Sequence, residues 1–238
     1  MLAAFKQPHP YRIVTLPHAH GGQPSRHIEV VRDVPVAIHL RIAETVECLR
    51  TALDYVAYAL SFRRHGDAFA SEVSFQVFDH LSEFKFHRPR TEKRLGHGAM
   101  KVLDGICPYR GGNDALWRIT RLNNRAKHRF LGLIGLAMQD SILPPAGGNQ
   151  LGAVQLGATG LGSLGQPAPS VPAGRVFVRL KDGAPLATPA REVSVDAQFP
   201  FEMAFDEPAI LQDQPVRPTL QDFVRETQRV IELFTPVF

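Results

Sequence analysis

The sequence carries one combination of side chains suited to acid–base chemistry at a phosphate: Arg121 and His128, with Asn124 between them. If this stretch is helical, all three lie on one flank, because residues three and four apart are neighbours on a helix. An arginine can hold a scissile RNA phosphate, and a histidine can move the proton of the 2′-hydroxyl. Asn124 would orient the histidine. This reaction requires no metal ion, and we expect neither a metal nor another cofactor.

The same stretch could instead form a purely structural network. Arg50 and Asp54 stand four residues apart on another expected helix, the spacing of a helical ion pair. Asp54 could also accept a hydrogen bond from Asn124, Lys127 or His128 and so dock the two helices, and such networks imitate functional clusters. The supporting network would comprise Arg50, Asp54, Lys127 and Arg129. Two hypotheses therefore stand: a metal-independent ribonuclease, and a non-catalytic binding or regulatory protein.

Residues 113–138 must position the candidate site, and they follow an unbroken helical pattern. We predict one helix of about 25 residues with Asn113 or Asp114 as its N-cap. Asn123 and Lys127 fall inside the apolar face or at its edge and would need partners there, since an unpaired buried polar group costs about 1–3 kcal/mol. The face expected to be buried comprises Leu116, Ile119, Leu122, Ala126, Phe130, Leu133 and Ile134.

Three further helical patterns are present. Apolar residues recur at three- and four-residue spacing through residues 35–64 and again through 218–234, which predicts two long amphipathic helices. Residues 81–106 are also helical in pattern, with a possible break near Pro89, because proline removes a backbone donor and clashes with the preceding turn.

Several short segments are typical of β-strands, because they are rich in β-branched and aromatic residues and are bounded by turn residues. They are residues 10–16, 26–31, 72–78, 175–180 and 197–205, with a shorter candidate at 191–195. We therefore predict an α+β fold in which a bundle of three to four long helices packs beside a small, mainly antiparallel sheet.

The expected organisation has three parts. Residues 1–140 form a helical core with N-terminal strands, and residues 175–238 add strands and a C-terminal helix to the same domain. Between them, residues 141–174 hold eight glycines and five prolines with almost no charge, which is typical of a long loop or linker.

Composition excludes some classes of protein. Of the 238 residues, 44% are hydrophobic and 21% charged, as in ordinary globular proteins, and no apolar run is long enough to span a membrane. We expect no membrane association and no secretory signal. The two cysteines, Cys48 and Cys107, are not in a Cys-x-x-Cys spacing and fit a reducing cytoplasm. The net charge of +4 is compatible with a nucleic-acid partner.

Four segments together resemble an uncharacterised bacterial family: CLRTALDYVAYAL at 48–60, FQVF at 75–78, CPY at 107–109 and LWRITRLNNRAKHR at 116–129. That family carries a Leu-Arg-x-Ala-Leu-Asp motif in one helix and a Leu-x-Asn-x-Asp-Lys-His-Arg motif in a later one. Ala126 stands where the family commonly has aspartate. The resemblance spans roughly residues 35–135 and implies no established activity.

More distantly, the helical half resembles HEPN domains, helical bundles many of which are ribonucleases in toxin–antitoxin and phage-defence systems. Their signature is an arginine followed, after four to six residues, by a histidine on one helix, which Arg121 and His128 match; Leu122 stands where the family usually has a polar residue. The resemblance implies a homodimer in which two Arg–His pairs face each other across a basic cleft. It also implies RNA as substrate and an antitoxin as a possible protein partner.

Overall fold

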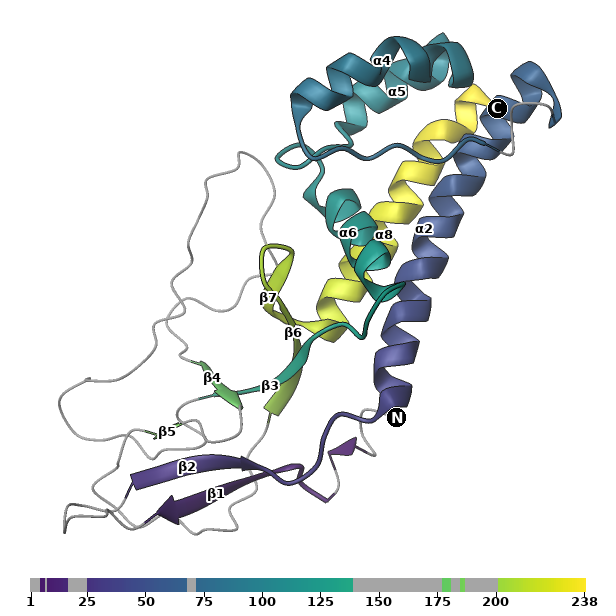
Figure 1. Ribbon diagram of the computed structural model, residues 1–238. Coiled ribbons are helices and arrows are strands. Elements are labelled where there is room, and N and C mark those ends of the chain that lie inside the picture. The colour runs from purple at the N-terminus through teal and green to yellow at the C-terminus, as the bar shows by residue number, and fades with distance from the viewer. Residues whose placement is uncertain are drawn as a thin grey trace. The chain divides into compact units, whose positions relative to one another are not determined.

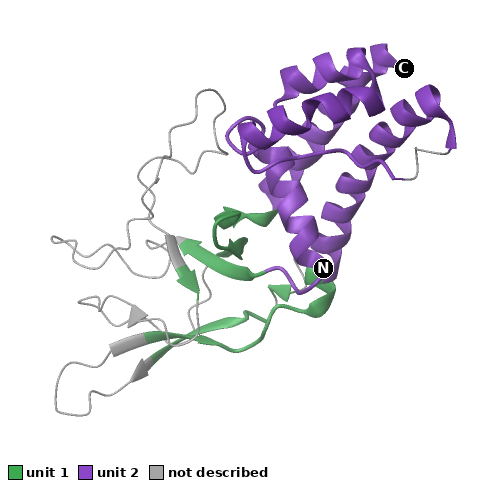
Figure 2. Cartoon of the chain, turned by 45° about the horizontal axis from the view of Figure 1, so that its top comes forward, with its two compact units in different colours: residues 1–39, 132–216 green, residues 40–131, 217–238 purple. Residues whose placement is uncertain are grey.

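The protein consists of two compact units, each assembled from separate stretches of sequence (Figure 2). Unit 1 comprises residues 1–39 and 132–216, and unit 2 comprises residues 40–131 and 217–238. The computed structural model describes residues 5–6, 8–16, 25–67, 72–138, 177–180, 185–186 and 201–238. These residues form helices and antiparallel sheets, which confirms the predicted α+β class (Figure 1).

Five helices of ten or more residues lie in the described part of the chain: α2 (Val36–His65), α4 (Leu81–Leu95), α5 (His97–Ile106), α6 (Asp114–Ala126) and α8 (Val216–Phe234). The two long helices expected at 35–64 and 218–234 are thus confirmed as α2 and α8. None of the described helices is long and apolar enough to cross a lipid bilayer.

The core of unit 2 draws apolar side chains from all five of these helices. Leu53 of α2, Met100 of α5, Leu116 of α6 and Phe234 of α8 are all fully buried in it. Burying surface of this kind stabilises the fold by roughly 25 cal/mol for each Å² of apolar area removed from water. The helical unit is therefore held by the amphipathic faces that the spacing of its apolar residues predicts.

The break between α4 and α5 lies at Gly96, and the expectation of a break near Pro89 is wrong. Pro89 remains inside α4. Gly96 has φ 96° and ψ 162°, while its N–H still donates to the carbonyl of Glu92 at 2.8 Å. A positive φ is favoured only by glycine. Backbone conformation, and not the missing donor of proline, therefore ends α4.

Unit 1 contains two antiparallel sheets. One has the order β1-β2-β5 and the other β4-β3-β6-β7. The strands are β1 (Tyr11–Leu16), β2 (Ser25–Val30), β3 (Leu133–Met138), β4 (Phe177–Leu180), β5 (Pro185–Leu186), β6 (Phe201–Glu207) and β7 (Leu211–Pro215). Four of these match strands predicted from the sequence. The predicted strand 191–195 and the glycine- and proline-rich segment 141–174 lie outside the described residues.

Residues 72–78, which we call the connecting segment, form a loop in unit 2 and no strand of either sheet. An isolated parallel bridge joins Phe78 to Tyr109. The alternation of residues in this segment predicted a strand, and that prediction is wrong. Phe75 and Phe78 are both buried in the helical core, so the alternation reflects packing against helices and not pairing with other strands.

The predicted 25-residue helix over 113–138 is also wrong in its second half. Asn113, one of the two predicted candidates, is the N-cap, with its side chain accepting from the N–H of Leu116 at 3.1 Å. The helix α6, however, ends at Ala126, and the chain enters β3 at Leu133. Phe130, expected on the buried face, is 55% exposed. The apolar residues from Leu133 onwards belong to a sheet and not to the helix.

Contacts made by Gly132 explain the change from helix to strand. Its N–H donates to the buried carboxylate of Glu207 at 2.6 Å, and its carbonyl accepts from the N–H of Asp206 at 2.8 Å. A Cβ atom on this residue would lie 2.4 Å from the carbonyl oxygen of Asp206. Similarly, a Cβ on Gly135 would lie 2.6 Å from the hydroxyl oxygen of Tyr11. At both positions any residue larger than glycine would clash with its neighbour.

Candidate functional site

Arg121 lies on α6 beside the chain's only tryptophan, and both side chains bind one carboxylate. The Trp117 indole N–H donates to Asp79 at 2.7 Å, and the Arg121 guanidinium forms an ion pair with the other oxygen of Asp79. Because Trp117 and Arg121 are one helical turn apart, a single residue preceding α4 can reach both. The carboxylate and the guanidinium are each little more than one-third exposed.

A second arginine completes this cluster. The guanidinium carbon of Arg110 lies 4.9 Å from the centroid of the Trp117 ring, and that of Arg121 lies 6.0 Å from it. Cations at such distances over an indole are attracted by the negative face of the ring. Trp117 itself is buried. The cluster thus combines two positive charges with one negative charge at the edge of the helical core.

His128 does not lie on α6, so the predicted placement of Arg121 and His128 on one continuous helix is wrong. Lys127 is the C-cap, and the N–H groups of His128 and Arg129 both donate to the carbonyl of Arg125 at 3.1 Å. Residues 125–129, which we call the basic turn, therefore prolong the helical course by about one turn. Asn124, Lys127, His128 and Arg129 are all exposed.

Lys127 needs no buried partner, contrary to expectation. Because α6 ends one residue earlier, the apolar face on whose edge Lys127 was expected to lie does not extend that far. A cation at this position is also favourable for another reason: the carbonyl groups at a helix C-terminus carry a partial negative charge. The presence of a cationic side chain in this turn is therefore explained in part by its stabilising effect on the C-terminus of α6.

Arg50 and Asp54 form the predicted ion pair on α2, with an Nη2–Oδ1 distance of 2.7 Å. The two paired side chains together hold the main chain of Phe75. Arg50 donates to the Phe75 carbonyl at 2.6 Å, and Asp54 accepts from the Phe75 N–H at 2.8 Å. Arg50 also donates to the hydroxyl of Thr120 on α6 at 3.4 Å. The pair therefore ties α2 to the connecting segment and to α6.

Burial shapes the electrostatics of this pair. The Arg50 side chain is 11% exposed and that of Asp54 36% exposed. Burial lowers the pKa of the Arg50 guanidinium, and the negative charge of Asp54 opposes that shift. In the part of the chain that the structure describes, the hydrogen bonds of Asp54 go to Arg50 and Phe75, and not to Lys127 or His128. The structure does not bring the two predicted polar stripes together through Asp54.

Two residues of the Arg121 cluster were not predicted from the sequence. Asp79 lies 42 positions before Arg121, and Arg110 lies in a turn. The one local signal for Asp79 is its position just ahead of the helix that begins at Leu81. Acidic residues are common at such positions because they favour the helix N-terminus, so the signal gives no indication of a pairing with Arg121.

We expect Asp79→Ala to lower the free energy of unfolding by about 1–2 kcal/mol, because Trp117 and Arg121 both lose their acceptor. Partial exposure keeps the effect below that of a fully buried pair. Urea unfolding followed by tryptophan fluorescence measures it. The matched control is Asp67→Ala, an exposed aspartate whose contact is a 3.4 Å hydrogen bond from Tyr58. Equal stability of the two variants would contradict a stabilising role for Asp79.

Comparison with protein-family models, with curated proteins and with solved structures finds no match to this chain. The described residues contain no group of three or more histidine, cysteine, aspartate or glutamate side chains placed to hold a metal ion. The candidate site therefore comprises the basic turn, the Arg121 cluster and the Arg50–Asp54 pair.

Proposed function

We propose that unit 2 binds RNA through the basic turn and that His128 cleaves the bound strand without a metal ion. The observation that carries the proposal is the turn itself. His128 is exposed there between Lys127 and Arg129, and residues 125–129 contain no acidic side chain. Cationic side chains supply most of the affinity of proteins for a phosphate backbone. Phe130, 55% exposed next to the turn, offers a ring on which a base can stack.

In the proposed reaction, the ring of His128 removes the proton of a ribose 2′-hydroxyl. The 2′-oxygen then attacks the adjacent phosphorus and the bond from phosphorus to the 5′-oxygen breaks, leaving a 2′,3′-cyclic phosphate. A protonated histidine of a second copy, or water, returns a proton to the leaving 5′-oxygen. Lys127 neutralises charge on the phosphate during the attack. A homodimer would provide both histidines.

In this proposal, the role of Arg121 depends on its ion pair with Asp79. Its guanidinium already pairs with Asp79, so it can hold a phosphate only by exchanging one anion for another or by sharing its remaining N–H groups. Asn124 is exposed on the last turn of α6 and is proposed to orient His128. Arg50 and Asp54 act at a distance, by holding Phe75 and contacting α6 at Thr120.

The proposed biological setting rests on the resemblance of Arg121 and His128 to the HEPN signature. On the basis of that resemblance we propose a toxin or phage-defence role in the cytoplasm, with an antitoxin as protein partner. An acidic partner surface could cover the basic turn by charge complementarity.

The test is cleavage of a mixed transfer- and messenger-RNA pool by the purified protein in the presence of EDTA. We expect His128→Ala to slow cleavage by roughly 10²–10⁴-fold, the usual contribution of a general acid–base residue. The matched control is His80→Ala, an exposed histidine of the same unit whose side chain makes no capping hydrogen bond to α4. Cleavage that persists in the His128 variant, or that EDTA abolishes, would contradict the proposed mechanism.

A second candidate is a non-catalytic RNA-binding or regulatory protein. It is favoured by the engagement of Arg50, Asp54 and Arg121 in contacts within the protein. In that case neither the wild type nor the histidine variant would cut RNA. Binding would still weaken steeply as salt concentration rises, because cations released from the phosphates drive the association.

A further inference from the structure

A pocket of about 180 Å³ opens in unit 2 between helix α4 and the connecting segment. Ser74 and Gln76 line it from the connecting segment, and His87, Arg90 and Arg94 line it from the helix. Val73 and Leu95 supply apolar surface. Drug-sized ligands occupy pockets of roughly 300–1,000 Å³, so this one suits a small group and not a whole cofactor.

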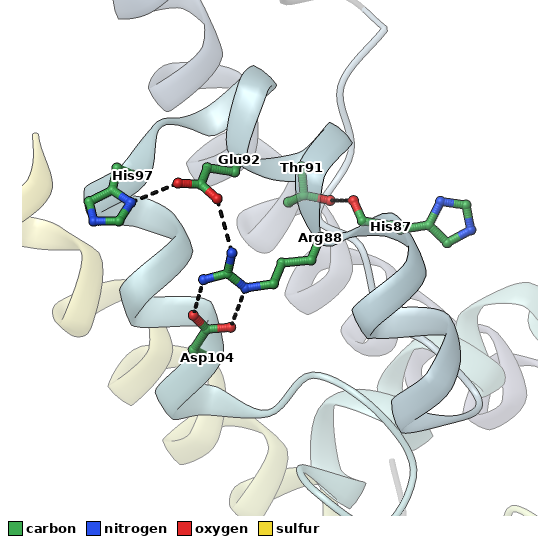
Figure 3. A network of polar contacts seen from close by, with 6 residues as sticks. All are labelled: His87, Arg88, Thr91, Glu92, His97 and Asp104. Carbon is green, nitrogen blue, oxygen red and sulfur yellow. Dashed lines mark hydrogen bonds and ion pairs between the residues drawn. The ribbon is translucent and has the colours of Figure 1, made fainter.

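The pocket is positively charged because the arginines on the two sides of α4 have different surroundings. On one side, Arg88 is neutralised: its guanidinium donates to Asp104 at 2.7 Å and to Glu92 at 3.0 Å (Figure 3). The Asp104 hydrogen bond raises the pKa of Arg88, and the His97 hydrogen bond lowers the pKa of Glu92. In Figure 3 the ring of His87 points away from this cluster.

On the other side, Arg90 and Arg94 stand one helical turn apart in the pocket wall. Among the described residues, no aspartate or glutamate lines the pocket. Two guanidinium groups of like charge at this spacing repel each other on an exposed helix. An anion placed between them would remove that repulsion and would accept hydrogen bonds from both.

The remaining polar groups suit an oxygen-rich anion. The Gln76 amide donates to the Ser74 hydroxyl oxygen at 3.0 Å, which leaves the hydroxyl proton of Ser74 available as a donor. Thr91 does not compete for the ligand, because its hydroxyl donates to the carbonyl of His87 at 3.1 Å (Figure 3). The ring of His87 stacks on Phe78 with the centroids 5.4 Å apart, which fixes one wall.

The opposite wall is fixed by the Arg50–Asp54 pair. Because that pair holds both main-chain groups of Phe75, the residues on either side of it, Ser74 and Gln76, are held in place. A pre-organised set of donors loses little conformational entropy when a ligand arrives. The pocket therefore combines fixed walls, two arginines and a hydroxyl donor.

We propose that this pocket binds a phosphate monoester, with Arg90 and Arg94 donating to its oxygen atoms and Ser74 donating a further hydrogen bond. The planar fork of arginine matches phosphate geometry and can engage two oxygens at once. A doubly charged phosphate uses both arginines, whereas a carboxylate has only two oxygens to share between them. The phosphate can belong to a free mononucleotide or to the 5′ end of an RNA strand. This inference does not depend on cleavage by His128.

The test is calorimetric titration of the purified 238-residue chain with inorganic phosphate and with adenosine 5′-monophosphate at fixed ionic strength. Arg90→Gln combined with Arg94→Gln is expected to weaken binding by roughly tenfold or more, because each variant residue loses charged hydrogen bonds. The matched control is Lys85→Gln combined with Lys101→Gln, which removes the same charge from exposed positions on α4 and α5. Near-equal melting temperatures show that both variants fold.

The outcomes separate the sources of the phosphate. Tight binding of the mononucleotide would assign the pocket to a free ligand. Preference for 5′-phosphorylated over 5′-hydroxyl RNA, lost in the arginine variant, would assign it to an RNA end. Absence of phosphate binding by the wild type, or equal weakening in the arginine and lysine variants, would overturn the proposal. RNA cleavage does not enter these readouts, so failure here and failure of the ribonuclease hypothesis are distinguishable.

Discussion

Replacing Arg50 with methionine is expected to lower the free energy of unfolding by about 3 kcal/mol. Methionine keeps much of the apolar stem, but it leaves the Phe75 carbonyl without its donor and Asp54 without its counter-charge. Removing one partner of a buried ion pair costs about 3–5 kcal/mol, and the partial exposure of Asp54 places the effect at the lower end. The chain's only tryptophan, Trp117, lies in the same unit and reports unfolding in urea.

The matched control for this variant is Arg41→Met on the same helix. Arg41 is exposed and pairs with Glu44 three residues away at 3.0 Å. Pairs of that kind contribute roughly 0–1 kcal/mol. Comparable losses in the two variants would mean that Arg50 is an ordinary surface charge, and the account of how Phe75 is held would be wrong.

Replacing Gly132 with alanine is expected to destabilise the protein by about 2–3 kcal/mol. The new Cβ would meet the main-chain carbonyl oxygen of Asp206 at 2.4 Å, and main-chain atoms in a sheet cannot move aside without disturbing their hydrogen bonds. Overpacking of this kind costs about 1–3 kcal/mol. The sign of the change in the free energy of unfolding distinguishes the observed structure from a continuous helix. A continuous helix through this position would gain about 1 kcal/mol of stability from the same change.

Thermal unfolding followed by far-ultraviolet circular dichroism measures this effect, and Gly105→Ala is the control. Gly105 lies in α5 with nothing within 4 Å of where its Cβ would be. That substitution is expected to stabilise the helix by about 0.5–1 kcal/mol. A rise in melting temperature for both glycine variants would contradict the close contact at Gly132 and would favour the continuous helix over residues 113–138.

Patterns between residues close in sequence correctly predicted the features that such residues determine. The apolar spacing of residues 35–64 predicted α2, and Asn113 predicted the start of α6. The ion pair between Arg50 and Asp54 was predicted because four residues separate neighbours on one helix face. For the helix cap and the ion pair, the stabilising partner lies within a few residues along the chain. For α2 the repeat of apolar residues is itself the local signal, although its buried face packs against helices distant in sequence.

The misses at α6, Arg121 and Asp54 share a different cause, which is a partner distant in sequence. The end of α6 depends on Gly132 contacting Asp206 and Glu207, more than seventy residues away. The partner of Arg121, Asp79, is separated from it by 42 residues. Asp54 binds a main-chain N–H group, which every residue except proline possesses and which therefore leaves no mark in a sequence. Tertiary contacts override local propensity at these positions.

The division of unit 2 between residues 40–131 and 217–238 has a consequence for how the protein is made. Val230 and Phe234 of α8 are fully buried in the helical core, and the ring of Phe234 lies edge-on to that of Phe75 with the centroids 6.1 Å apart. Protein domains usually fold as units while they leave the ribosome. Here α2 to α6 emerge long before α8 is synthesised. We therefore expect the nascent chain to expose part of this apolar core until the last helix arrives, and exposed apolar surface of this kind makes a chain prone to aggregation and a substrate for chaperones.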